Sequence, residues 1–255
     1  LIKKRVIFDF RQEDIKNNGQ GAPLTPIFHN LVSKYINKQN QIQFPIGFIN
    51  IGGISNITKV LRGNGKIEEN LEAFDSGPGN CLIDEWIRVN SKKKFDKDGL
   101  IAQSGKIDQL ILNQAIDNFE IQSYDKSLDI KNFDTSFARG LSFEDGCATI
   151  TNFTAYLIAK GIEYSNKDKS KNIKYLICGG GRKNNFLINC IKDYSSNQTN
   201  ITLDIIDNYK YDGDYIESQA FGYLAIRSFL NLPISFPKTT GCNKPTVGGK
   251  MVENY

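Results

Sequence analysis

Residues 174–181, KYLICGGG, most strongly constrain the fold, because a buried apolar strand ends there in three glycines and leads into an amphipathic helix, NNFLINCIKDYS. A short strand, TLDIID, follows at 202–207, and a long helix is expected at 215–230. Helices expected at 106–118 and 143–165 come before the first of these strands. This order of helices, strand, helix, strand and helix predicts α/β layers rather than an all-β fold.

The first third of the chain is richer in strands. The run VIFDF at 6–10 predicts a buried strand, and two β-rich runs at 44–61 flank Gly52-Gly53, which indicates a hairpin. KIEENLEAF predicts a third strand that ends at Asp75, and a helix is expected from Asn80 to about Val89. A further helix is predicted by apolar residues spaced for one buried face, namely Phe28, Leu31, Val32 and Tyr35.

Composition narrows the possible functions. The net charge of +4 comes from 32 basic and 28 acidic residues whose lysines are scattered, so we expect no nucleic-acid partner. His29 is the single histidine and the five cysteines form no CxxC pair, so neither a metal site nor a disulfide framework is predicted. Reduced thiols favour a cytoplasmic location. No apolar run reaches the roughly 20 residues that span a bilayer, so no membrane partner is predicted either.

Two glycine segments each allow two interpretations. In INIGGISN (49–56), small residues between strands let the backbone approach an anion, and Ser55 and Asn56 add donors. An ordinary hairpin turn is the favoured reading of that segment taken alone. In ICGGGRKNN (177–185), glycines between strand and helix can admit a nucleotide, but the spacing matches neither a Rossmann site nor a P-loop. A tight strand-to-helix connection explains it equally well.

FDSGPGN (74–80) places a carboxylate among glycines just before a helix. Asp75 can accept a proton from a hydroxyl or a water, which is a role of carboxylates in phosphoryl transfer to sugars. The alternative is an aspartate that caps the helix. Asn80 and Ser76 lie closer to the helix start and suit a cap better, so we favour a catalytic site at Asp75.

DGDYIESQAF (212–221) places acidic side chains at the start of the long helix. One interpretation of Asp212 and Asp214 is that they complement the helix dipole. Glu217 lies about one turn into the helix and faces either a cleft or solvent. The local pattern does not separate these two possibilities.

Several segments together resemble the anhydro-N-acetylmuramic acid kinases, relatives of the hexokinase and actin-like ATPases. The matching stretches cover nearly the whole chain: FDFRQEDIKNNGQGAPLTPIFH (8–29), INIGGISNIT (49–58), FDSGPGNCLIDEWI (74–87), ICGGGRKNNFLI (177–188) and the run from 212 to 241. The resemblance implies an α/β fold with two RNase H-like lobes and a cleft between them. Residues 1–45 would end the N-terminal lobe and carry a substrate loop, and 46–255 would form the C-terminal lobe.

The resemblance also implies a reaction, in which ATP and Mg²⁺ support hydrolytic opening of 1,6-anhydro-N-acetylmuramic acid and phosphorylation of O6. The product, N-acetylmuramic acid 6-phosphate, belongs to peptidoglycan recycling. Asp75 matches the general base that activates the attacking water, and Glu217 is a second acidic candidate. The implied ATP-binding residues are Gly52, Gly53, Ser55, Asn56, Gly179, Gly180, Gly181 and Asn184. The implied substrate-binding residues are Asp9, Arg11, Gln20, Gly21, Gly77 and Asn80, with Arg11 suited to the lactyl carboxylate. A homodimer is expected as well.

The chain also departs from the family pattern. Nothing in it matches the family's opening Gly-Thr-Ser-x-Asp-Gly phosphate loop, and it begins with Leu1, so the first strands of the N-terminal lobe are expected to be absent. We therefore expect this piece alone to bind ATP poorly and to have weak or no activity. The family's Lys-Ser-Thr-Gly-Arg-Glu segment appears here as KSLDIKNF (126–133), which lacks its Arg and Glu. Another sugar or acetate-type kinase, or a non-catalytic binding remnant, are the alternative functions.

Overall fold

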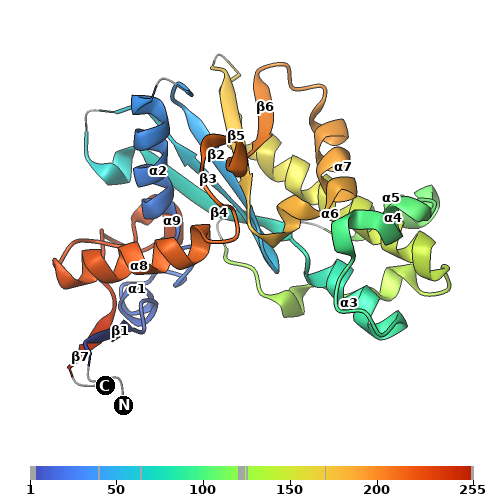
Figure 1. The fold of residues 1–255 in the computed structure, drawn as a ribbon, viewed down its shortest axis with the longest axis horizontal. Coiled ribbons are helices and arrows are strands. Elements are labelled where there is room, and N and C mark those ends of the chain that lie inside the picture. The colour runs from blue at the N-terminus through green and yellow to red at the C-terminus, as the bar shows by residue number, and fades with distance from the viewer. Residues whose placement is uncertain are drawn as a thin grey trace.

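The computed structural model describes residues 4–39, 41–63, 65–119, 124, 126–169 and 171–253. Its centre is a five-stranded sheet in the order β4-β3-β2-β5-β6 (Figure 1). The strands are β2 (Ile46–Ile51), β3 (Ile54–Val60), β4 (Leu71–Pro78), β5 (Ile173–Cys178) and β6 (Ile201–Ile205). β2 and β3 form the predicted hairpin, and β5 runs parallel to both β2 and β6. The predicted α/β class is confirmed.

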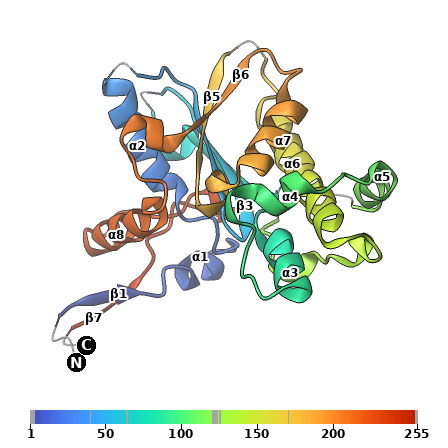
Figure 2. The same ribbon diagram turned by 45° about the vertical axis from the view of Figure 1, so that its right-hand side comes forward.

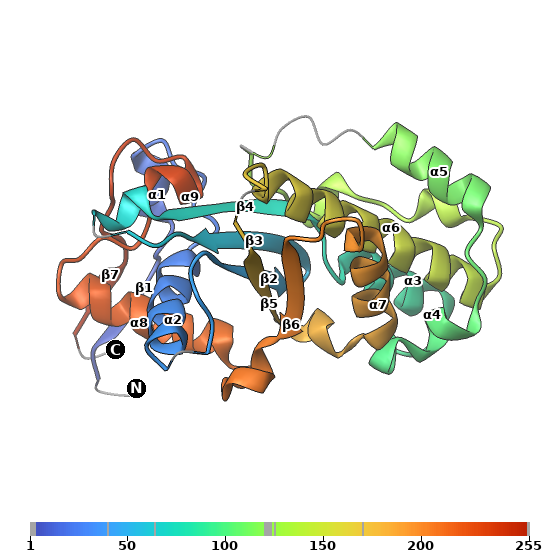
Figure 3. The same cartoon turned by 90° about the horizontal axis from the view of Figure 1, so that it is seen from above.

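Helices cover both faces of this sheet (Figure 3). One face carries α3 (Cys81–Asn90), α6 (Phe143–Ser165) and α7 (Asn185–Ser195), while α4 (Leu100–Ser104) and α5 (Gln109–Asn118) contact α6. The other face carries α2 (Pro26–Lys38) and α8 (Ile216–Phe229). Strand residues alternate between the two cores, so Ile49 packs on the α6 side and Phe48 on the α2 side. No helix in the described ranges is both long and apolar enough to cross a membrane.

The two ends of the described chain lie together beside α8. β1 (Val6–Phe8) pairs antiparallel with β7 (Lys250–Val252) in a separate two-stranded ribbon (Figure 2). Two short helices, α1 (Gln12–Lys16) and α9 (Pro237–Thr240), lie near it in sequence. The strand predicted at 6–10 is confirmed over Val6–Phe8. The expectation that it is buried is wrong, because it pairs with β7 outside the central sheet and leaves Phe8 44% exposed.

Two further predictions need correction. The strand expected to end at Asp75 begins at Leu71 and continues to Pro78, because Pro78 pairs with Ile54 of β3 beyond a bulge. The helix expected around Phe28 is confirmed as α2, but Tyr35 is 54% exposed and does not belong to its buried face. The helix expected at 143–165 is confirmed with those bounds as α6.

His29 of α2 is buried against the central sheet. Its ring stacks on Phe48 with centroids 4.5 Å apart, and its Nδ1 lies 2.9 Å from the hydroxyl of Thr58. Its Nε2 is buried and has no hydrogen-bond partner among the described residues. Burial lowers the pKa of His29 to about 3, so the folded protein holds it neutral.

Acidification is therefore expected to destabilise the protein through His29. An unfolded histidine has a pKa near 6.5. Between pH 6.5 and about pH 3, His29 is therefore protonated in the unfolded state but neutral in the folded state. The stability that neutral His29 provides is complete above pH 6.5 and falls by about 1.4 kcal/mol per pH unit below it. Urea unfolding from about pH 7 to pH 5 measures this slope. His29→Gln should remove the slope, and equal slopes in both proteins would contradict the prediction.

Candidate active site

Four side chains form one row across the sheet near the carboxyl ends of β2, β4 and β5. Asp75 of β4 lies opposite Asn56 of β3, which lies opposite Asn50 of β2, which lies opposite Cys178 of β5. Residues directly opposed in a sheet project from the same face, with Cβ atoms about 5 Å apart. Ligands of α/β proteins bind at this edge of the sheet. The row thus joins two residues of the predicted site, Asp75 and Asn56, and adds Asn50, which the sequence analysis did not select.

The Asp75 carboxylate is 6% exposed and is held on one side. Its Oδ2 accepts hydrogen bonds from the Ser127 hydroxyl at 2.9 Å and from the Leu128 N–H at 2.8 Å. Burial raises its pKa, while these two hydrogen bonds and the charge of Arg11 act in the opposite direction. Asp75 does not cap α3, whose N-cap residue is Asn80. A buried carboxylate in this setting can accept a proton.

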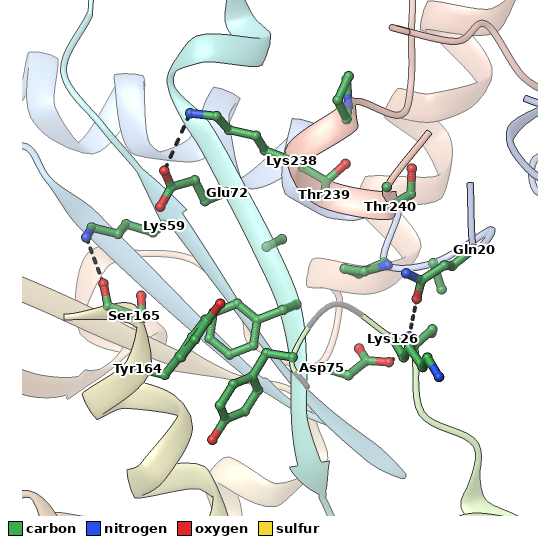
Figure 4. Close-up of a pocket in the computed structure, with 18 of the residues that line it drawn as sticks. Gln20, Lys59, Glu72, Asp75, Lys126, Tyr164, Ser165, Lys238, Thr239 and Thr240 are labelled. Carbon is green, nitrogen blue, oxygen red and sulfur yellow. Dashed lines mark hydrogen bonds and ion pairs between the residues drawn. The ribbon is translucent and has the colours of Figure 1, made fainter. Parts of the chain in front are cut away.

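A cavity of about 460 Å³ runs along β4, the edge strand of the sheet, beside Asp75 (Figure 4). Rings from β4 and α6, Phe74 and Tyr164, lie 5.1 Å apart at its wall. The cavity is lined by Gln20, Ala22, Pro23, Lys59, Glu72, Ala73, Phe74, Asp75, Tyr124, Lys126, Ser127, Tyr164, Ser165, Lys167, Asp168, Pro237, Lys238, Thr239, Thr240 and Gly241. Of the predicted substrate residues, Gln20 is among them.

The glycine turns at 52–53 and 77–80 touch each other. Gly79 N–H donates to the Gly53 carbonyl at 2.9 Å and Asn80 N–H to the Gly52 carbonyl at 2.7 Å. A Cβ atom on Gly79 would overlap the Gly52 carbonyl oxygen, so only glycine fits at that contact. Packing between turns therefore accounts for part of this glycine pattern.

Ser55 supports the same two turns from inside the sheet. Its side chain is fully buried, and its hydroxyl lies 2.8 Å from that of Ser76 and donates to the Gly77 carbonyl at 3.1 Å. Gly77 is itself buried against Leu157. Ser55 and Gly77, predicted to contact ATP and substrate, hold the two turns together through these contacts.

The glycine turn after β5 lies against the end of β2. A Cβ on Gly179, whose φ is +80°, would come within 2.6 Å of both Asn50 Oδ1 and the Ile51 carbonyl oxygen. Gly180 is exposed, and Asn184 caps α7 by accepting from the Leu187 N–H at 2.9 Å. A second cavity, of about 470 Å³, joins this turn to α3 and is lined by Asn80, Ile83, Asp84, Phe95, Asp96, Lys97, Asp98, Gly180, Lys183, Asn184 and Asp214.

Arg182 fastens the glycine turn to the loop before α8. Its guanidinium donates to both carboxylate oxygens of Asp207, at 2.7 and 3.1 Å, and to Asp214 at 2.7 Å. The same side chain donates to the Gly179 carbonyl at 3.1 Å and is 5% exposed. The acidic residues before α8 therefore bind an arginine, and the helix dipole is not their main partner.

Arg182→Met is expected to lower the free energy of unfolding by about 2–3 kcal/mol, because it removes charge-assisted hydrogen bonds to two carboxylates. Lys183→Met is the matched control. Lys183 is 56% exposed and pairs only with Asp214 among the described residues, so its loss should cost less than about 1 kcal/mol. Urea unfolding of both variants measures the difference, and equal losses would show that burial of Arg182 adds nothing.

The predicted residues that line neither cavity include Asp9, Glu217 and Gly21. Asp9 pairs with Lys250 of β7 at 2.6 Å. Glu217 is exposed on α8. Burial raises the pKa of Cys178, at the opposite end of the row from Asp75, and the charge of Glu217 acts in the same direction. Gly21 donates its N–H to the buried Asp14 at 2.7 Å. The structure thus gathers Asp75 and Gln20 at one cavity and Asn80, Gly180 and Asn184 at the other.

Comparison with known proteins shows similarity to one protein family. Residues 2–254 match the family model described as anhydro-N-acetylmuramic acid kinase. Curated proteins of that name are 52% identical in Pelagibacter ubique, over 100% of this chain, and 36% identical in Brucella canis and Zymomonas mobilis, over 97% and 98% of it. The chain spans 66%, 64% and 64% of those three relatives.

One solved structure that is similar is an activator of 2-hydroxyisocaproyl-CoA dehydratase from Clostridium difficile with bound ADPNP. The matched region covers 72% of this chain and 64% of the activator chain. Its TM-score is 0.38 and its sequence identity is 15%, so the likeness carries no argument about function.

Proposed function

This chain belongs to the anhydro-N-acetylmuramic acid kinase family, and we propose that it forms the catalytic part of an enzyme that opens 1,6-anhydro-N-acetylmuramic acid with water and phosphorylates O6. The observation that carries the proposal is the position of Asp75. It is a buried carboxylate with a raised pKa that borders a cavity and stands at the carboxyl edge of the sheet. A general base that activates water needs this combination of access and basicity.

The proposed reaction has two parts, ring opening by water and phosphoryl transfer to O6. Asp75 takes a proton from a water whose oxygen attacks the anomeric carbon, and the bond between that carbon and O6 breaks. The freed O6 takes the γ-phosphoryl group of ATP, and the bond from that phosphorus to the ADP oxygen breaks. The products are N-acetylmuramic acid 6-phosphate and ADP. Most of the catalytic contribution in such a transfer is positioning and electrostatic stabilisation.

The second cavity and the turns beside it are the proposed nucleotide side. Gly180, Asn184 and Asn80 border that cavity, and Gly52 and Gly53 lie where the turns meet. Gly179, Gly181 and Ser55 shape these turns from behind. Asn56 stands between the two sides, opposite Asp75.

Magnesium is proposed to accompany ATP. In the described ranges no group of three or more His, Cys, Asp or Glu side chains is placed to hold a metal ion. In kinases Mg²⁺ is held largely through substrate phosphates and waters, with one or two carboxylates. When bound, the ion neutralises charge on the phosphates.

The sugar is proposed to occupy the cavity beside Asp75. Gln20 lines it, and Arg11 lies close enough for its charge to affect the Asp75 pKa. A guanidinium pairs well with a carboxylate, so Arg11 is the proposed partner of the lactyl group. Glu217 is kept as a second acidic candidate at the other end of the row, and Asp9 as a neighbour of the same loop.

The experiment is incubation of the complete gene product that contains these 255 residues with ATP, Mg²⁺ and 1,6-anhydro-N-acetylmuramic acid. Mass spectrometry then identifies the product. The proposed reaction adds one water and one phosphoryl group to the sugar, whereas a simple sugar kinase adds the phosphoryl group alone. Gain of both supports the proposal, gain of the phosphoryl group alone favours another sugar kinase, and no product from folded protein rules out this substrate.

The division of the chain at residue 45, the homodimer and the cytoplasmic location stay predictions. α2, from the first 45 residues, contacts α8 from the C-terminal part, so the division does not separate two independent sets of contacts. Light scattering of the complete gene product measures its oligomeric state.

A further inference from the structure

The two oxygens of Asp75 differ in their surroundings. Oδ2 accepts hydrogen bonds from both Ser127 and Leu128. In the described part of the chain, no hydrogen bond reaches Oδ1. A carboxylate held through one oxygen keeps a fixed orientation and presents the other oxygen to a proton donor.

Ser127 is itself held by a second segment. Its backbone N–H donates to Oε1 of Gln20, a residue more than a hundred positions earlier. Gln20 in turn donates its backbone N–H to the Thr240 carbonyl at 2.9 Å, next to α9. The position of Ser127 is therefore set by long-range contacts and not only by its sequence neighbours.

The loop that carries Gln20 is fixed by a buried carboxylate. Asp14 of α1 is 1% exposed and accepts hydrogen bonds from the Gly21 N–H and the Thr240 hydroxyl, both at 2.7 Å. A Cβ on Gly19 would overlap the Asp14 carboxylate, so the loop passes tightly over it. A continuous set of contacts thus runs from Asp14 through Gln20 and Ser127 to Asp75.

We propose that Ser127 is a positioning residue for the proposed reaction, anchored by Gln20 so that its hydroxyl fixes Asp75 and leaves Oδ1 to accept the proton. This inference rests on the proposed function of Asp75 as the base. The sequence alone does not identify Ser127 as a functional residue. Segment 126–133 is distinguished there only because the Arg and Glu of the family pattern are missing. Its side chain reaches the reacting region through Asp75 and is not proposed to touch the sugar.

The proposal has an electrostatic consequence. Burial raises the Asp75 pKa, and the Leu128 and Ser127 hydrogen bonds lower it, as does Arg11. Loss of the Ser127 hydroxyl removes one of the lowering contributions, so the pKa should rise further. The other charged groups around the cavity stay the same in wild type and variant: Lys59, Glu72, Lys126, Lys167, Asp168 and Lys238.

Ser127→Ala and Ser127→Thr in the complete gene product form the kinetic test. Ser127→Ala should lower kcat about ten- to hundredfold with little change in KM, because the base is misplaced and not the substrate. The acidic limb of the pH–rate profile should move to higher pH. Threonine keeps the hydroxyl and should restore both. Wild-type kcat and an unmoved pH profile in Ser127→Ala would overturn the proposal.

A second measurement separates this proposal from the proposed function. Carbon-13 carboxyl NMR of the 255-residue chain, with the Asp75 signal assigned by its loss in Asp75→Asn, gives the Asp75 pKa without any sugar or ATP. A raised pKa in Ser127→Ala, with wild-type protein that phosphorylates no sugar, would support the positioning contact and reject the kinase assignment. An unchanged pKa would reject the positioning contact even in an active enzyme.

Gln20→Ala provides an independent variant should Ser127→Ala fold poorly. It leaves Ser127 and Asp75 intact and removes the hydrogen bond from the Ser127 N–H to the Gln20 side chain, so it should raise the Asp75 pKa by a smaller amount than Ser127→Ala does. The double variant should lower kcat no more than Ser127→Ala does, because both act through one contact. Fully additive losses would overturn the proposed order of contacts.

Discussion

Asp75→Asn is expected to lower kcat for the anhydro-sugar reaction by about a thousandfold or more, within the range that a lost general base costs. Asparagine keeps the size of the side chain, and its carbonyl oxygen can accept the bonds from Ser127 and Leu128. It cannot take a proton from water. The measurement is single-turnover formation of the 6-phosphate by the complete gene product at saturating substrate.

The same substitution is expected to stabilise the protein at neutral pH. Burial raises the Asp75 pKa above that of the unfolded chain, so the folded state pays for ionising it once the pH exceeds both values. Below the unfolded value of 3.8 both states hold the proton and the cost is absent. Asparagine is never ionised, so the free energy of unfolding at pH 7 should rise.

Asp117→Asn is the control for this pair of effects. Asp117 is exposed on α5 and lines neither cavity beside the sheet, so both rate and stability should stay near wild type. An Asp75→Asn protein that keeps more than a tenth of the wild-type kcat would remove Asp75 from the role of base. One that is inactive but less stable would show that Asp75 has a structural role instead.

The local sequence pattern was sufficient to predict an element where that element is long and its buried face is uniformly apolar. α6 has its predicted bounds because Ser142 caps it, accepting from the Asp145 N–H at 3.1 Å, and because most of its length is buried. The β2–β3 hairpin follows from alternating apolar residues around Gly52-Gly53. Such signals are carried by neighbours in sequence.

Long-range pairing explains what the sequence did not reveal. β4 was expected to end at Asp75, but Ile54 pairs with Pro78, and the strand continues through Ser76, Gly77 and Pro78. The ribbon of β1 and β7 joins residues at opposite ends of the chain, so neither strand signals its partner. Tyr35 has the spacing of a core residue, yet its side chain is 54% exposed.

The candidate site also contains residues that the sequence identified and residues that only the structure identified. Asp75 stands out in sequence because a carboxylate beside glycines needs explanation. The structure places it at a cavity, with no hydrogen bond to its Oδ1 from any residue that the structure describes. Ser127 and Leu128 gave no comparable signal, since one contributes a common hydroxyl and the other only its backbone N–H. Asn50 joins the row through strand register, which cannot be read from a single strand.

Gly79→Ala is expected to lower the free energy of unfolding by about 3 kcal/mol, the other large effect. The added Cβ would overlap the Gly52 carbonyl oxygen, which is backbone and cannot rotate away. The two turns must then separate, which strains the hydrogen bonds from Gly79 and Asn80 to the hairpin. Overpacking costs about 1–3 kcal/mol and each weakened hydrogen bond about 1 kcal/mol more. Urea unfolding of the 255-residue chain measures the loss.

Gly222→Ala is the matched control, because it adds the same methyl group where a Cβ meets nothing within 4 Å. Gly222 lies on the exposed side of α8, and alanine favours a helix over glycine by about 1 kcal/mol, so this variant should be more stable than wild type. If the added methyl group lowers the free energy of unfolding at Gly79 and raises it at Gly222, the loss at Gly79 comes from the contact between the two turns. If Gly79→Ala instead unfolds like wild type, the turns can move apart freely, and they would then be a weak platform for the phosphates of ATP.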